Sequence, residues 1–245
     1  MQWFNADLHI HSVLSPCGGL EMAPFDLVSR LRELEINWMA ITDHNSMANC
    51  AAYEKVAKMA GIRYTWGVEM QTAEEIHMLV YFDDKEAAQS FDKELYAALP
   101  PIDNDPDFFG DQVVIDENAN ILRMEQKALS SSVYWDLSEA VSIARAHGGY
   151  CVPAHVDAGA NSILSQLGFM PLEPEFDLLG ITARLNLSSF LKQHPQLAGK
   201  AFLRCSDAHY LSDLGSGSTR LKLTDATVAD LISAVHKAPR TEIII

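Results

Sequence analysis

The 245-residue chain has few cysteines, little positive charge and no long apolar segment. Its four cysteines lie far apart without a CxxC pair, which excludes a disulfide-rich secreted scaffold and favours reduced thiols. No uncharged apolar stretch approaches the ~18 residues of a membrane span, and the N-terminus lacks the pattern of a secretory leader. Lys+Arg total 18 against 33 Asp+Glu, giving a net charge of −15. We therefore expect a cytoplasmic protein with no membrane partner and no extended nucleic-acid surface.

The rest of the composition is that of a soluble globular protein, 48% hydrophobic and 21% charged. Short apolar runs alternate with segments of helical periodicity, which predicts an α/β fold with parallel strands in a single domain over residues 1–245. Strands are expected at 3–10, 38–42, 62–68, 76–82, 150–154, 178–182, 201–206 and 242–245. Helices are expected from Pro24, after the capping residue Asp136, and near 48–60, 84–98, 187–194 and 225–237.

One long stretch, at about residues 99–133, interrupts this alternation. It is rich in Pro, Asp, Asn and Ser, and Pro100-Pro101 breaks any regular element. We interpret it as an insertion or lid over one face of the domain, and the alternative is a loose surface excursion.

Six of the nine histidines lie at the ends of expected strands or inside them. His9 and His11 are two residues apart on one strand, so both side chains point to the same face. Strand-end carboxylates accompany them, and the C-terminal ends of barrel strands converge on one mouth. The full set of candidate ligands is His9, His11, His44, Glu69, His77, His155, Asp207 and His209.

A lone strand histidine is more often a structural polar residue than a ligand, so each position alone is weak. The combination has no simple structural explanation, because burying so many ionisable groups without ions would cost several kcal/mol each. Imidazoles and carboxylates together suit zinc, manganese or ferrous iron. The pattern therefore predicts a polynuclear site for divalent metal ions.

At this point the sequence resembles the polymerase and histidinol phosphatase (PHP) family of metal-dependent phosphoesterases. The matching motifs occur in the family's order: Asp7-Leu-His-Ile-His-Ser12, Thr42-Asp-His-Asn45, Gly67-Val-Glu69, Pro153-Ala-His155 and Ser206-Asp-Ala-His209. The resemblance implies a distorted seven-stranded (β/α)7 TIM-like barrel with two or three ions at its mouth. It also implies three ligand sets: His9, His11, Glu69 and Asp207 for one ion, Glu69 with His77 and His155 for a second, and His44 with His209 for a third.

Four further residues have two readings each. Cys17 replaces a histidine found in trinuclear members and is either a thiolate ligand or part of a tight turn. Asp43 is expected to hold an imidazole by a hydrogen bond, with direct ligation as the alternative. Asp157 either has a functional role, orienting a ligand or acting as the leaving-group acid, or it only caps a turn. Arg184 is either a phosphate-binding group or a surface charge.

The ligand chemistry predicts hydrolysis of a phosphate ester of a small metabolite, a nucleotide or an oligonucleotide end. Two cations about 3.5–4 Å apart would share Glu69 and generate a bridging hydroxide, the expected nucleophile. Glu69, Asp207 and Asp157 are accordingly the candidate catalytic residues. The alternatives are an amidohydrolase, which bridges its metals with a carboxylated lysine or an equivalent group, and a metal-binding module without catalysis.

Overall fold

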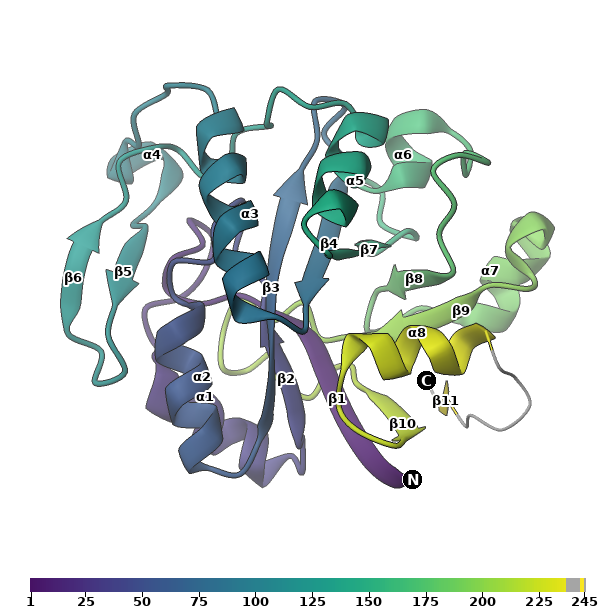
Figure 1. The fold of residues 1–245 in the computed structure, drawn as a ribbon, viewed down its shortest axis with the longest axis horizontal. Coiled ribbons are helices and arrows are strands. Elements are labelled where there is room, and N and C mark those ends of the chain that lie inside the picture. Colours follow the sequence, from purple (N-terminus) through teal and green to yellow (C-terminus); the bar gives the residue numbers. More distant parts are fainter. Residues whose placement is uncertain (237–242, 245) are drawn as a thin grey trace.

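A curled sheet of seven strands runs through the centre of the computed structural model, which describes residues 1–236 and 243–244 (Figure 1). The strand order is β11-β10-β1-β2-β3-β4-β7. These strands are β1 (Gln2–Ile10), β2 (Trp38–Ile41), β3 (Arg63–Gln71), β4 (His77–Phe82), β7 (Tyr150–Pro153), β10 (Thr219–Leu223) and β11 (Ile243–Ile244). Residues 242 and 245 of the expected final strand lie outside the described residues.

The directions of the strands correct the expectation of an all-parallel sheet. Strands β1, β2 and β3 are parallel, but β4 runs antiparallel to both β3 and β7. The cause is the short connection at 72–76, where Thr72 N donates to Ile76 O at 3.0 Å, because so few residues allow a hairpin but no crossover helix. As a result, His77, the first residue of β4, lies at the same end of the strands as the C-terminal residues of β1–β3.

Two more strands, β8 (Leu178–Ile181) and β9 (Ala201–Arg204), form a separate parallel pair. A few backbone hydrogen bonds join this pair to the main sheet on both sides: Val156 N donates to Gly180 O at 2.8 Å on the β7 side, and Asp207 N donates to His9 O at 3.0 Å and His11 N to Ala208 O at 2.9 Å on the β1 side. Within the described residues the strand ladders do not close, so the fold is a partial barrel, and a complete (β/α)7 barrel is not formed.

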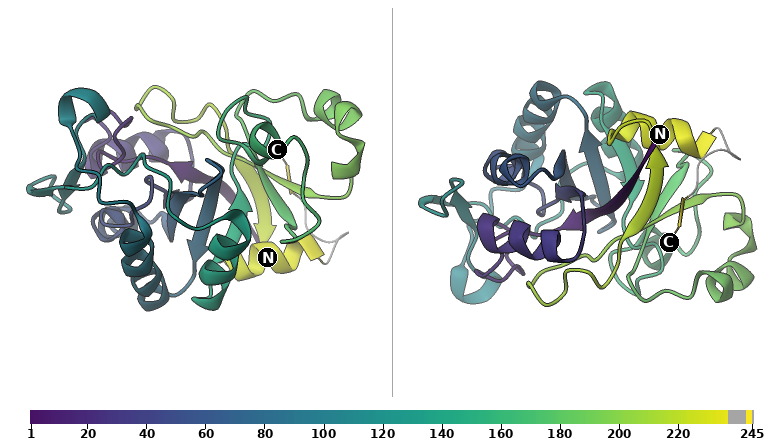
Figure 2. Two further views of the ribbon diagram at one scale, coloured as in Figure 1. Left: turned by 90° about the horizontal axis from the view of Figure 1, so that it is seen from above. Right: turned by 90° about the horizontal axis from the view of Figure 1, so that it is seen from below.

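Helices surround the strands, as the views along the other axis show (Figure 2). They are α1 (Pro24–Glu33), α2 (Cys50–Met59), α3 (Lys85–Ala98), α4 (Pro106–Phe109), α5 (Leu137–Ala146), α6 (Ile163–Leu167), α7 (Leu187–Gln193) and α8 (Val228–His236). The Asp136 side chain accepts a bond from Glu139 N at 2.9 Å, which confirms it as the cap of α5. Sequence patterns did not predict α6 or β10, which are short elements.

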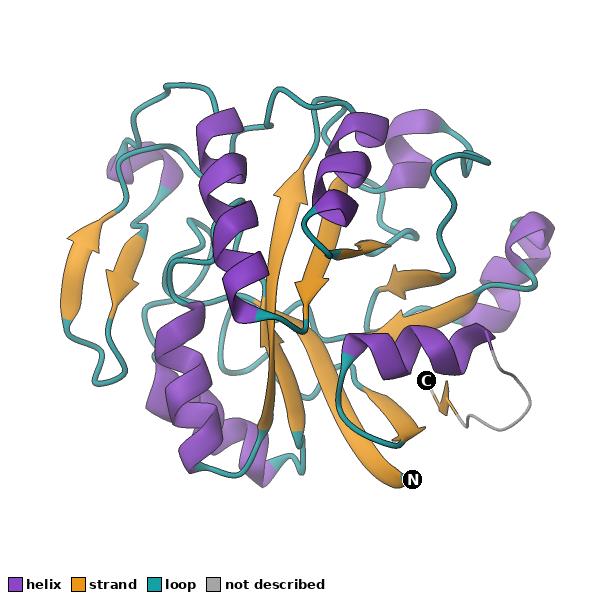
Figure 3. Ribbon diagram, viewed as in Figure 1, coloured by secondary structure: helices purple, strands orange, loops and turns teal. Residues whose placement is uncertain are grey.

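The insertion at 99–133 contains α4 and a two-stranded hairpin of β5 (Val113–Ile115) and β6 (Ile121–Met124), at the left of Figure 3. Two buried asparagines hold it against the domain. Asn49 Nδ2 donates to Val113 O at 2.9 Å, and Asn45 Nδ2 donates to the carbonyls of Leu129 and Ser131 at 2.8 and 2.9 Å. These contacts fix the segment at Val113, Leu129 and Ser131, and its role as a lid stays a prediction.

None of the described helices has the length and apolar character required to cross a membrane.

Candidate metal centre

Glu69 lies at the centre of a cluster of imidazoles and is 1% exposed. Strand β3 places it at the edge where β1 ends and β4 begins. Five histidine nitrogens lie within 3.4 Å of its carboxylate. Oε1 is 3.2 Å from His9 Nε2, 3.1 Å from His77 Nδ1 and 3.2 Å from His155 Nε2, and Oε2 is 3.4 Å from His11 Nε2 and 3.2 Å from His44 Nδ1.

A second carboxylate, that of Asp207, completes one side of the cluster after β9. Its Oδ1 lies 3.2 Å from His9 Nε2 and 3.1 Å from His11 Nε2. The ring of His209 stacks on His11 with centroids 4.1 Å apart, and its Nδ1 donates to the Asp207 carbonyl at 2.8 Å. His209 therefore keeps Nε2 free as a lone-pair donor.

The donor atoms gather in three compact groups that share residues: His9, His11 and Glu69; His44, Glu69 and His77; and His11, His44 and His209. His9 Nε2 and His11 Nε2 face each other at 3.2 Å. The buried Nδ1 atoms of His44 and His77 lie close to Glu69 without a well-aligned hydrogen bond, whereas His155 turns Nε2 toward Glu69. Buried polar atoms are normally satisfied, so the converging nitrogens and carboxylates fit a set of adjacent divalent cations.

The ring of His77 is held in one orientation by its neighbour across the hairpin. Gln71 Oε1 lies 3.1 Å from His77 Nε2, and Gln71 Nε2 donates to Ser132 Oγ at 3.0 Å. Because the amide nitrogen is engaged with Ser132, the amide oxygen accepts from His77 Nε2–H. The lone pair on His77 Nδ1 then points at Glu69.

The pKa values within the cluster reflect a competition between burial and charge. Burial alone would raise the pKa of Glu69, but His77 and His9 outweigh it and hold that pKa well below its usual range. Burial would lower the pKa of His9, but Asp207 and Glu69 outweigh it and raise that pKa to about 9. Burial and the His11 ring lower the pKa of His209. A cation binding at His9 therefore has to displace a proton at neutral pH.

Backbone strain is present in the same region, at three of the seven non-glycine residues with positive φ in the described part of the chain. His155, Asp207 and Asn45 have left-handed φ values of 28°, 53° and 49°. Such conformations cost about 1–2 kcal/mol per non-glycine residue and cluster at functional sites. They turn the chain sharply at the ends of β7 and β9, which directs His155 and Asp207 toward Glu69.

Asp43 and Cys17 lie beside the cluster but outside its three groups. Both oxygens of the Asp43 carboxylate accept hydrogen bonds from serines: Oδ1 from Ser15 Oγ at 2.7 Å, and Oδ2 from Ser12 Oγ at 2.6 Å. Cys17 lies in the turn after Ser15, and as a whole residue it is exposed. Its sulfur is nevertheless largely shielded by surrounding protein atoms, and this burial, reinforced by the Glu69 carboxylate, raises the pKa of Cys17 to about 12.

Arg184 and Asp157 lie near the ends of β8 and β7. Arg184 is exposed and lines a cavity of about 360 Å³ together with Ser206 and Asp207, so it shares a hollow with the cluster. Asp157 Oδ1 accepts from Thr182 N at 2.8 Å, and Oδ2 accepts from the Thr182 hydroxyl. Asp157 therefore braces the loop that carries Arg184.

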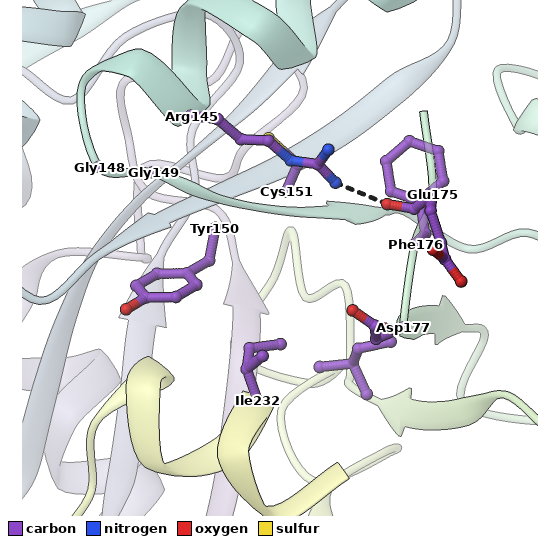
Figure 4. A pocket seen from close by; sticks show the side chains of 10 residues that line it. Arg145, Gly148, Gly149, Tyr150, Cys151, Glu175, Phe176, Asp177 and Ile232 are labelled. Atoms are coloured by element: carbon purple, nitrogen blue, oxygen red, sulfur yellow. Dashed lines mark hydrogen bonds between the residues drawn. The ribbon is translucent and has the colours of Figure 1, made fainter. Parts of the chain in front are cut away.

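A cavity of about 490 Å³ lies elsewhere, between α5, β7 and α8 (Figure 4). Its arginine, Arg145, donates to the Glu175 carbonyl at 2.6 Å. Burial raises the pKa of its thiol, Cys151, to about 12. No group of metal-ligating side chains among the described residues includes a residue of this cavity, so we place the functional site at the histidine cluster instead.

Sequence reasoning missed Ser12, Ser15 and Gln71, which hold ligand side chains rather than bind ions themselves. Ser15 Oγ lies 2.8 Å from His11 Nδ1. A usable signal was present, because Ser12 and Ser15 follow the His-x-His pair within four residues.

Comparison with known proteins agrees with this arrangement. The family model of the PHP domain matches residues 7–161, so the chain belongs to the PHP domain family. No curated protein matches the chain.

Several solved structures share the fold. Endonuclease Q of Pyrococcus furiosus, a lesion-specific endonuclease, has 16% identity and a TM-score of 0.70; the match covers 100% of this chain but only 58% of that one. A metal-dependent phosphoesterase of Bifidobacterium adolescentis has 20% identity and a TM-score of 0.57, over 83% of this chain and 87% of that one. An amidohydrolase of Chromobacterium violaceum with bound sulfate has 18% identity and a TM-score of 0.58, over 98% of this chain and 97% of that one.

Proposed function

We propose that the chain is a metal-dependent hydrolase of phosphate esters. The observation that carries the proposal is the Glu69 carboxylate, whose two oxygens each face a different set of imidazoles, because that arrangement suits a ligand shared by two cations. Membership of the PHP domain family supports it. When bound, zinc, manganese or ferrous ions would supply Lewis acidity and lower the pKa of a water near Glu69.

The chain's own side chains position the ions and the substrate. Glu69 would serve two ions, with Asp207, His9 and His11 as further ligands of one and His77 and His155 as further ligands of the other. Glu69 Oε1 faces His9 as well as His77 and His155, and Oε2 faces His11 and His44, so the two oxygens do not divide the imidazoles along these sets. His44 and His209 would hold a third ion. The ions would neutralise the carboxylates of Glu69 and Asp207, so an anionic phosphate can approach despite the net charge of −15.

Arg184 is the proposed substrate-binding residue. Its cavity opens beside Asp207 and is lined by the hydroxyl-bearing residues Thr182, Ser206 and Ser212. A guanidinium at its edge can pair with phosphate oxygens, and hydroxyl groups can bind a polar alcohol portion. At about 360 Å³, the cavity suits a small phosphate ester of a metabolite or nucleotide. Asp157 is retained as the proposed leaving-group acid, although both of its oxygens already accept from Thr182.

An endonuclease is a second candidate, favoured by the likeness to Endonuclease Q, one complex of which holds a duplex with an abasic lesion. An amidohydrolase is favoured only by the likeness to the Chromobacterium violaceum protein. Strands β1–β4 and β7, whose ends carry the cluster, contain no lysine that could carry a bridging carboxylate, and Glu69 occupies that place.

The test is hydrolysis by the protein loaded with manganese or zinc. Substrates are p-nitrophenyl phosphate, a panel of nucleotides and sugar phosphates, a duplex with an abasic site, and a cyclic amide. We expect phosphate release that requires the metal and disappears in Glu69→Gln. The matched control is Glu125→Gln, which changes a buried glutamate outside the cluster. Cleavage of the duplex alone would favour the endonuclease, amide cleavage alone the amidohydrolase, and inertness toward every substrate a non-catalytic module.

A further inference from the structure

A buried hydrogen-bonded chain leads from His11 into the protein. His11 Nδ1 lies 2.8 Å from Ser15 Oγ, and Ser15 Oγ donates to Asp43 Oδ1 at 2.7 Å. His11 and Ser15 are fully buried, and Asp43 is 1% exposed. None of these contacts is open to exchange with solvent, so the direction of each bond is set by the groups themselves.

The direction follows from the available protons. The Asp43 carboxylate can only accept, so the single hydroxyl proton of Ser15 goes to Asp43. His44 N also donates to Ser15 Oγ, at 3.3 Å. The Ser15 oxygen is then an acceptor toward His11, which must carry its proton on Nδ1. In the neutral ring that holds a cation, Nε2 then carries the lone pair, and it lies 3.1 Å from Asp207 Oδ1 and 3.4 Å from Glu69 Oε2, oxygens that the same cation would separate from it.

Asp43 is itself fixed on its far side. Ser12 N donates to Oδ1 at 2.6 Å and Ser12 Oγ donates to Oδ2 at 2.6 Å. Ser12 Oγ accepts in turn from Asn49 Nδ2 at 3.1 Å, and Asn49 also holds the β5–β6 hairpin through Val113 O. The loop is tight, since a Cβ at Gly18 would lie 2.4 Å from Ser12 O. Asp43 therefore cannot rotate toward an ion without breaking three bonds from serines.

We propose that Ser15 is a positioning residue that sets the tautomer of His11, and that Asp43 acts on the metal centre only through Ser15. Through the contacts of Ser12 and Asn49, the segment at 99–133 supports the hydrogen-bonded chain of Asp43, Ser15 and His11. The proposal rests on the metal centre of the proposed function but on no particular substrate.

The experiment uses zinc and the intact chain. Zinc affinity is measured by competition with a chromogenic chelator, zinc content at saturation by elemental analysis, and the His11 ring by long-range ¹H–¹⁵N spectra of the zinc-loaded protein. We expect Ser15→Ala to weaken one zinc site by about 10–100-fold, the usual effect of losing a group that orients a ligand. Its spectrum should lose the slowly exchanging Nδ1 proton of His11, and Ser15→Thr should restore both.

The matched control is Thr65→Ala, which removes another buried hydroxyl, the acceptor of the Trp38 indole N–H, from the opposite part of β3. We expect it to leave zinc affinity unchanged. Asp43→Asn should bind the full number of zinc ions at saturation, with weaker affinity. Loss of one ion from Asp43→Asn would identify Asp43 as a direct ligand and overturn the proposal. Unchanged zinc affinity in Ser15→Ala, or a loss of zinc affinity equal to that of Thr65→Ala, would also overturn the proposal. If the wild-type chain binds no zinc, the metal centre itself fails.

Discussion

Replacing Glu69 by glutamine keeps the shape of the side chain and removes the charge that faces five imidazoles. Without metal, the effect on stability follows from His9. Its pKa of about 9 against 6.5 corresponds to roughly 3 kcal/mol of net stabilisation of the charged ring, the balance left after the opposing cost of burial, with Asp207 and Glu69 as the largest favourable contributors. That stabilisation is fully present below pH 6.5 and is lost as the pH rises through about 9. The Glu69 share requires its carboxylate to be ionised, so it is lost as the pH falls below the depressed pKa of Glu69.

With metal, the expected effect is larger. A ligand at 100 times its Kd stabilises the folded state by about 2.7 kcal/mol, and each kcal/mol raises the Tm of a chain this size by roughly 2–4 °C. Wild-type protein should therefore gain roughly 5–10 °C from manganese or zinc at that excess. Glu69→Gln should gain less than half of this, because the ligand shared by two ions is gone.

Scanning calorimetry at pH 6 and pH 9, with and without metal, measures both effects. Glu125→Gln controls for the loss of a buried carboxylate outside the cluster. A Glu69→Gln variant with the full thermal shift and the wild-type ion content would show that Glu69 does not bridge ions, and the proposed function would lose its main support.

Further predictions concern protons, substrate binding and the loop after β7. Because His9 must lose its proton, metal affinity should rise about tenfold per pH unit up to pH 9. Calorimetry in buffers of different ionisation enthalpy should show the released proton. A metal affinity that does not change with pH would contradict the pKa of about 9. Arg184→Ala should raise KM at least tenfold with little change in kcat, whereas the distant Arg220→Ala should change neither; equal effects would make Arg184 an ordinary surface charge. Asp157→Asn should lower kcat more for esters with a poor leaving group than for p-nitrophenyl phosphate, because a good leaving group needs no acid. If both substrates lose kcat equally and Thr182→Val gives the same loss of Tm, Asp157 only braces the loop.

Much of the strand pattern and of the ligand set was readable in the sequence, because apolar runs mark strands and motif residues follow them. Strand β1 spans Gln2–Ile10 against an expected 3–10, and β2 spans Trp38–Ile41 against 38–42. The structure brings together all the histidines expected at the cluster. Local patterns sufficed here because each strand contributes its ligands at or near one end.

The directions of the strands in the sheet could not be predicted in the same way. The apolar run of β4 looks the same in either direction, and only the short hydrogen-bonded turn before it makes it antiparallel. The side-chain partners of Asp43 were equally hidden, since they depend on the close approach of loops that start 31 residues apart in the chain. Backbone strain at His155 and Asp207 also arises from tertiary contacts and leaves no mark on composition.

The hairpin of β3 and β4 has one further consequence, for folding. In its ladder Glu69 pairs with Leu79 and Gln71 pairs with His77. A slip of one residue would turn His77 to the opposite face, away from Glu69. The native alignment presents both donors to one cation, so a bound cation would disfavour such a one-residue slip while the chain acquires its structure.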